Sequence, residues 1–400
     1  MCGYMPAIHP SPFPPRREAA RERLSAFVPK ADRSYATGRN FDRGKVEKQS
    51  VSCLSPYISR RMLTEEEVVT SVLERHELGQ VEKYIQEVCW RTYWKGWLEQ
   101  RPEIWREYLN ELEETKQTWS EDTALEQKWK TAVAGRTNLT AFNHWVHELK
   151  TVGYLHNHAR MWFAGIWIYD LGLPWQLGAD FFFQNLLDRD AASNTLSWRW
   201  VAGLHTQGKR YVPSAGNIEK FTEGRFDEAG KLTCDKQGPE FDPHPERKPI
   251  AFPQDETEAP EVLLLHRDDF AMDLPDEWTE NLRKVVLLDI PSSYGTCLAA
   301  DHVQEFDQSA LYDAKARWDA DFDCEILPLC ELNTWWTKRN PHSCAIARAP
   351  VGLVQDALET VWTKTETRPR ELVRDWDRTL WPLATAGFFG FWKKARKTLN

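Results

Sequence analysis

Two short segments decide the fold of this 400-residue chain: GYLHNHARM at residues 153–161 and LDRDAASNTLSWRW at residues 187–200. Both place charged side chains among apolar ones. Arg160 stands in a predicted helix whose other faces carry tryptophan, phenylalanine and isoleucine, so its buried guanidinium needs an anionic partner. Asp188 and Asp190 are the candidates. A buried ion pair of this kind most often has a structural role, so it does not by itself indicate a function.

The pattern around these segments is helical. From Pro14 to about Phe221, apolar residues recur at three- and four-residue spacing. A stretch rich in Pro, Gly and charge follows at 227–260 and resembles a linker. Short apolar runs then alternate with helical patterns, which predicts a small parallel sheet with strands at 261–265, 284–290, 324–327 and 344–347. We expect a helical domain at 1–230, a linker at 231–259, and an α/β domain with a helical tail at 260–400.

Several classes of protein are excluded by what the sequence lacks. Its eight cysteines include no C-x-x-C pair, so no metal site is predicted. The longest apolar run, 161–169, is too short to cross a bilayer, and we expect a cytoplasmic protein with no membrane partner. Neither a P-loop nor a G-x-G-x-x-G motif occurs, so a nucleotide cofactor would not bind through a Rossmann fingerprint.

Charge and tryptophan are both unevenly distributed. The net charge is −9, yet residues 1–61 hold 12 Lys/Arg against 5 Asp/Glu, whereas residues 251–330 hold 5 against 19. A DNA-binding face would therefore be a local basic patch in the N-terminal part. The chain has 20 tryptophans, which could fill a core, stack on bases or carry electrons.

The segment from Gly153 to Trp200 resembles the flavin-binding core of photolyases and cryptochromes. Two earlier segments fit in the same order: residues 52–57 are similar to the family's phosphate loop, and residues 84–94 to its E-L-x-W-R helix. The resemblance spans roughly residues 14–226. It implies an all-α photolyase-type domain that binds FAD, followed here by a smaller C-terminal α/β domain with a parallel sheet.

The domain order resembles that of short bacterial photolyase-like proteins with inverted topology. In those proteins a C-terminal α/β domain covers the flavin site and no antenna pigment is expected. The acidic balance of this domain speaks against its binding DNA, because phosphate contacts need Lys and Arg.

The resemblance assigns a set of cofactor-binding residues. Arg160 and Asp188 would pair beside the flavin ring, Asp190 would contact its polar edge, and Asn194 would face its N5 atom. Val51 stands where the family usually has a threonine, which removes one phosphate contact. The full set is Ser52, Cys53, Leu54, Ser55, Tyr84, Arg91, Asn157, Arg160, Asp188, Asp190 and Asn194.

Two tryptophans match the family's electron-transfer chain, and a third is chosen to complete it. Trp198 and Trp175 correspond to its inner two members by spacing. Trp119 is chosen as the outer one, although Trp129 competes because the intervening loop does not align cleanly.

The dimer pocket of the family gives the substrate-binding set. Glu87, the catalytic carboxyl, would donate a hydrogen bond to a pyrimidine carbonyl in its protonated form. Relatives that repair (6-4) products carry histidines at the positions of Asn157 and Met161, so this chain resembles the cyclobutane type. His158 stands where many relatives have arginine. The set is Glu87, Trp90, Asn157, His158, Met161 and Trp200.

The expected function is therefore light-driven repair of cyclobutane pyrimidine dimers by electron transfer from excited reduced FAD. The partner is UV-damaged DNA, preferably single-stranded because lesion unpairing then costs less, and a monomer is expected. The alternative is a cryptochrome-like blue-light sensor without repair activity.

Overall fold

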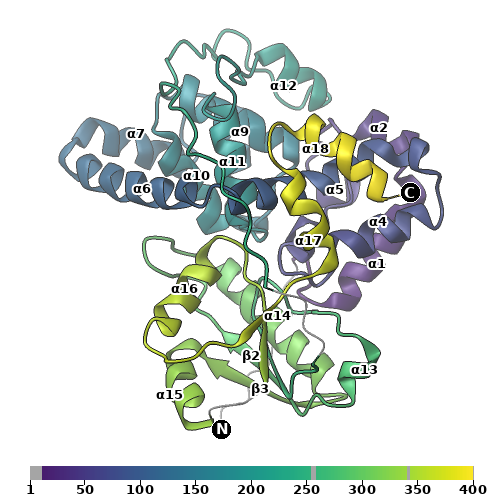
Figure 1. Cartoon of the computed structure of the whole chain (residues 1–400). Coiled ribbons are helices and arrows are strands. Elements are labelled where there is room, and N and C mark those ends of the chain that lie inside the picture. The colour runs from purple at the N-terminus through teal and green to yellow at the C-terminus, as the bar shows by residue number, and fades with distance from the viewer. Residues whose placement is uncertain (1–10, 254–257, 340–342, 400) are drawn as a thin grey trace.

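The computed structural model describes residues 11–253, 258–339 and 343–399. Its N-terminal part is helical (Figure 1). The helices are α1 (Arg17–Phe27), α2 (Arg33–Gly38), α3 (Ser55–Ile58), α4 (Glu65–Leu73), α5 (Leu78–Glu99), α6 (Glu103–Glu121), α7 (Thr123–Val133), α8 (Thr140–Val152), α9 (Asn157–Tyr169), α10 (Trp175–Asn185), α11 (Ala191–Val201) and α12 (Ala215–Phe221).

The C-terminal part alternates strands and helices and ends in helices. Its elements are β1 (Val262–Leu265), α13 (Asp276–Thr279), β2 (Lys284–Asp289), α14 (Asp301–Trp318), β3 (Asp323–Pro328), α15 (Leu329–Arg339), β4 (Cys344–Ala347), α16 (Leu353–Trp362), β5 (Arg370–Leu372), α17 (Asp375–Leu380), the 3₁₀ turn η3 (Trp381–Leu383) and α18 (Phe388–Ala395). The predicted fold class, helical and then α/β, is confirmed.

The sheet is parallel throughout, with strand order β3-β2-β1-β4-β5. Successive residues along a strand point to opposite faces of the sheet, and helices cover each face. Leu263 and Leu265 pack into the large core that includes α14, whereas Leu264 packs into a second cluster with α15 and α16. Strand β5 was not predicted, because Arg-Glu-Leu at this edge offers no apolar run.

Helix α5 is the axis of the helical domain. Most of its faces are buried, since α2, α4, α11 and the C-terminal helices all pack on it. Gly96 permits the closest of these approaches: a Cβ there would lie 2.6 Å from the Trp381 Cα. Helix α4 begins with a capping box in which Thr64 and Glu67 bind each other's backbone amides.

Buried ion pairs join the two domains. Arg60 lies 2.8 Å from Asp307, and Arg61 pairs with both Asp269 and Asp377. Arg60 and Arg61 are thus used inside the protein, whereas the other Lys and Arg side chains of residues 1–61 are partly or fully exposed.

The helical domain docks where the strand order of the sheet reverses. Glu99 on α5 accepts a hydrogen bond from the Val351 amide, which follows β4, at 2.6 Å. Asp269, which pairs with Arg61, follows β1. The carboxyl ends of β1 and β4 form the switch point at which open α/β sheets usually bind ligands. In this chain the helical domain lies against that point.

The C-terminal helices leave the α/β domain and return to the helical domain (Figure 1). Helices α17 and α18 and the turn η3 all contact α5. The segment predicted as a tail of the α/β domain therefore completes the core of the other domain. Among the described residues, no helix is long and apolar enough to cross a membrane, and no three His, Cys, Asp or Glu side chains are grouped to hold a metal.

Candidate functional site

A cavity of about 500 Å³ opens in the helical domain between α2, α5, α9, α11 and the loop before α3. It brings together nearly all the residues predicted for the site. Those lining it are Ser52, Cys53, Leu54, Ser55, Tyr84, Glu87, Trp90, Arg91, Asn157, His158, Arg160, Met161, Asp188, Asp190, Asn194, Trp198 and Trp200.

The loop at residues 51–55 forms one end of the cavity. Cys53 has a φ of +53°, a left-handed conformation that turns the chain directly before α3. The turn places the hydroxyl-bearing residues Ser52 and Ser55 on the cavity wall, where a helix begins. Hydroxyls and backbone amides in such a turn suit a diphosphate.

Two carboxylates are held ionised at the centre of the site. Arg160 Nη1 lies 2.9 Å from Asp188 Oδ2, which resolves the choice of its partner. Arg91 and Lys95 lie 3.1 and 3.6 Å from Asp190 Oδ2. Burial alone would raise the pKa of Asp190, but Lys95, Arg91 and the amide that Asp190 caps at the start of α11 lower it to about 2.

Asn194 lines the cavity and is anchored through one end of its side-chain amide. Its amide nitrogen donates to the carbonyl oxygen of Ala179 at 2.8 Å. This bond uses one of the two N–H donors, so the amide keeps one donor and its oxygen acceptor for a further partner.

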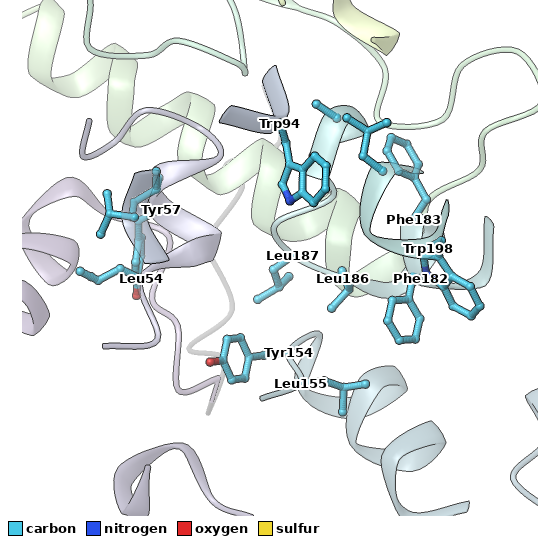
Figure 2. Packing of buried hydrophobic residues seen from close by; sticks show 14 of the residues in the cluster. Leu54, Tyr57, Trp94, Tyr154, Leu155, Phe182, Phe183, Leu186, Leu187 and Trp198 are labelled. Atoms are coloured by element: carbon cyan, nitrogen blue, oxygen red, sulfur yellow. The ribbon is translucent and has the colours of Figure 1, made fainter. Parts of the chain in front are cut away.

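Trp198 is packed against the cavity by other rings. Its centroid lies 5.1 Å from that of Phe182 and 6.3 Å from that of Trp167, and Figure 2 shows Trp198 beside Phe182. The indole Nε1 is buried without a hydrogen-bond partner. Gly178 is required here, because a Cβ at this position would overlap the Trp198 ring.

The two other predicted tryptophans lie away from the cavity lining. Trp175 begins α10, one turn before Gly178, and its ring lies 5.5 Å from that of Tyr108. Trp119 packs on Trp129 at 4.3 Å, so both candidates for the outer position occupy one place in the fold.

The mouth of the cavity carries the predicted substrate residues. Asn157 and Met161 are at least partly open to solvent in the first turns of α9, and Trp200 lies 5.9 Å from the Tyr211 ring. His158 stacks on Trp162 at 4.2 Å. Its Nδ1 lies 2.9 Å from the Asn40 carbonyl oxygen, so the backbone already engages this ring.

Glu87 has a partner that sequence reasoning missed. Arg39 Nη1 lies 2.5 Å from Glu87 Oε1. Burial raises the pKa of Glu87, while Arg39 and Lys83 oppose the shift. Arg39 lies in the loop after α2 and carries no sequence signal for this role. Also missed was Phe388, whose ring stacks on Trp90 with centroids 3.8 Å apart and planes 8° from parallel. The aromatic run at 388–392 was the signal that could have found it.

The donor set fits FAD. Ser52 and Ser55, the ionised Asp188 and Asp190, and Asn194 line one continuous cavity.

Residues 84–246 match the family described as the FAD binding domain of DNA photolyase. The deoxyribodipyrimidine photo-lyase of Thermus thermophilus is 31% identical over 219 residues, 52% of this chain and 48% of the relative. The deoxyribodipyrimidine photo-lyase of Buchnera aphidicola is 27% identical over 213 residues, which cover 52% of this chain and 43% of the relative. A class III photolyase structure from Agrobacterium tumefaciens matches with a TM-score of 0.44 and 23% identity, covering 52% of this chain and 43% of that one. The chain spans about half the length of the curated relatives it matches.

Proposed function

The chain belongs to the photolyase/cryptochrome superfamily, and on this basis we propose that it repairs cyclobutane pyrimidine dimers in DNA with light. One observation carries the proposal: Glu87, Trp90 and Trp200 line the same cavity as Asp188 and Asn194. Groups suited to a damaged base thus lie within one space with groups suited to a flavin.

The cofactor end of the cavity is built to hold and shield a flavin. Bound FAD, in its reduced form, supplies the electron that light excites. The Arg160–Asp188 and Arg91–Asp190 pairs would hold charge beside the flavin ring, and Asn194 would hydrogen-bond to the N5 edge of that ring. Apolar walls exclude water from this end; they include Leu155, Ala164, Phe182 and Leu186.

The substrate end receives the lesion. Trp90 and Trp200 offer aromatic faces to an extruded dimer. Glu87 donates a hydrogen bond to a pyrimidine carbonyl when protonated, and its raised pKa favours that form. As the dimer gains an electron, this donor stabilises the developing negative charge.

We extend the proposal to single-stranded DNA bound by a monomer. A dimer in a single strand has no pairing partner to leave, so its extrusion costs less than from a duplex. The net charge of −9 also limits the phosphate contacts that a duplex would need.

The Glu87–Arg39 ion pair supports a second candidate, a blue-light sensor without repair activity. In the ionised form that pairs with Arg39, Glu87 has no proton to donate to a pyrimidine carbonyl. In this candidate the cavity binds FAD and the tryptophans reduce it, but no lesion enters.

Illumination of the full chain, loaded with FAD and reduced, distinguishes the two. A dimer-containing oligothymidine is supplied as a single strand or in a duplex, and the products are separated by chromatography. We expect dimers to disappear in the light only, faster from the single strand, with a large loss of rate in Glu87→Ala and none in Glu74→Ala at the exposed end of α4. Unchanged dimers in both substrates, with intact flavin photoreduction, would reject repair in favour of the sensor.

A further inference from the structure

Helix α18 supports the wall of the cavity from behind. Phe388 stacks on one face of Trp90 and is not among the residues that line the cavity. The helix is fixed to α5 at its other end, where Trp392 Nε1 donates to Glu82 Oε1 at 2.9 Å. Between these two contacts, Tyr93 of α5 packs on Phe388 and Phe391 with ring centroids 5.6 Å apart in each case, so α18 is held on α5 along its length.

The outward face of α18 carries an unusually exposed ring. Phe389 is 73% exposed, whereas the next most exposed large apolar side chain among the described residues, Leu298, is 54% exposed. Phe389 lies 5.7 Å from the Phe388 ring, so a single ring separates it from Trp90. Gly387 and Gly390 flank it, and a Cβ at either would meet open space. A planar group can approach this ring without steric hindrance.

Positive charge continues along the same face. Lys393 follows Phe389 by four residues and so lies on its side of the helix, with Lys394 beside it. Both are exposed, and within the described part of the chain neither forms an ion pair. Lys83, one turn before Glu87 on α5, adds a further exposed cation near the cavity residue Glu87.

We propose that Phe389, Lys393 and Lys394 form a strand-binding ridge for single-stranded DNA beside the lesion pocket. Phe389 stacks on a base that neighbours the dimer, and the two lysines contact phosphates further along the strand. The inference rests on the proposed function and adds a binding element outside residues 84–246. An aromatic ring next to unpaired cations is the combination by which proteins hold single strands without reading sequence.

Binding titrations of the full chain with bound FAD test the ridge. A fluorescent oligothymidine with one central dimer and its undamaged counterpart are followed by anisotropy, in darkness, at several salt concentrations. We expect Phe389→Ala to weaken binding of both oligonucleotides about tenfold, and Phe389→Trp to restore it. Leu298→Ala, the matched loss of an exposed apolar side chain on the other domain, should bind like the parent.

Charge reversal tests the lysines separately. Lys393→Glu/Lys394→Glu should weaken binding and reduce the slope of log affinity against log salt by about 1.4, the value for two phosphate contacts on a single strand. Lys338→Glu/Lys364→Glu makes the same charge change on the α/β domain and should leave the slope unchanged. Flavin absorption and the unfolding midpoint verify that each variant is folded.

The outcomes separate the ridge from repair itself. Parental affinity in Phe389→Ala would overturn the ridge, even if dimers are repaired. Phe389-dependent binding without any repair in the light would leave the ridge standing and reject the proposed function. If sedimentation instead shows a concentration-dependent dimer that Phe389→Ala abolishes while DNA affinity is unchanged, the ring is a self-association contact and the ridge is wrong.

Discussion

Arg60 donates from Nε to Asp307 Oδ1 at 2.8 Å, across 247 positions of sequence. Both side chains are almost fully buried. Burial raises the pKa of Asp307, but Arg60, Arg267 and Arg189 outweigh it and hold the pKa below its usual value. The two domains are thus joined through charges that have left water, and Asp307 depends on the arginines around it to remain ionised.

Arg60→Ala should destabilise the protein by about 3–5 kcal/mol, because it leaves a buried carboxylate without its closest cation. Urea denaturation followed by tryptophan fluorescence measures the change. Arg21→Ala removes an arginine that is 59% exposed in its pair with Glu67, and should cost less than about 1 kcal/mol. Equal stability of the two variants would show that the buried pair contributes nothing specific.

Repair should depend on pH through Glu87. Burial raises the pKa of this group, and the protonated form is the donor, so the rate should fall as pH rises through that pKa. Arg39→Ala removes an opposing charge and should move the fall to higher pH. Glu87→Gln donates at every pH and should flatten the profile. Rates from pH 5 to 9 under fixed light test this, and a parental profile in both variants contradicts it.

Stability should also depend on pH through Glu87, and Glu87→Gln should flatten this pH dependence too. A carboxyl whose pKa is raised by folding binds its proton more tightly in the folded state, so its contribution is lost as pH rises above about 4.3. Glu87→Gln should therefore lose less unfolding free energy than the parent between pH 4 and pH 8. Denaturation at both pH values measures the difference.

Gly178→Ala should displace Trp198, because the added methyl group overlaps the indole. We expect slower flavin photoreduction and a loss of about 1–3 kcal/mol in stability. Gly79→Ala is the matched control, since its Cβ would meet open space in α5, and it should be neutral or slightly stabilising. Photoreduction at the parental rate in Gly178→Ala would mean that Trp198 is not on the electron path.

Trp198→Phe and Trp175→Phe should each slow photoreduction more than tenfold while leaving repair by chemically reduced protein intact. Trp167→Phe tests the ring that lies 6.3 Å from Trp198. The expected result is near-parental photoreduction, because Trp167 is a packing residue whose indole nitrogen donates to the Pro174 carbonyl. A loss equal to that of Trp175→Phe would redirect the path through Trp167.

Local sequence patterns predicted the helical domain and four of the strands, and the resemblance to photolyases and cryptochromes supplied most of the cavity lining. Arg160, Asp188 and Asn194 could be found because two adjacent motifs carry them with recognisable spacing. Strand β5 and the partners of Glu87 and Trp90 could not. Arg39 is an ordinary arginine after a short helix, and Phe388 meets Trp90 only through the folding of everything between them.

The charge asymmetry was visible in the sequence, but its meaning was not. An excess of arginine in residues 1–61 is compatible with a DNA-binding surface and with buried ion pairs between the domains. Composition cannot distinguish the two, because it does not show which side chains are buried. The structure places Arg60 and Arg61 in the interior, against acidic residues of the second half.

The contact between Glu82 and Trp392 spans 310 positions, and the α/β domain is encoded inside that interval. During translation, α5 therefore leaves the ribosome long before the helix that braces it. A nascent chain holding only the first domain would have Trp90 without its stacking partner. Trp90, which lines the cavity, gains its stacking partner only after the α/β domain has been synthesised. A ligand can therefore bind to the completed cavity only after that point.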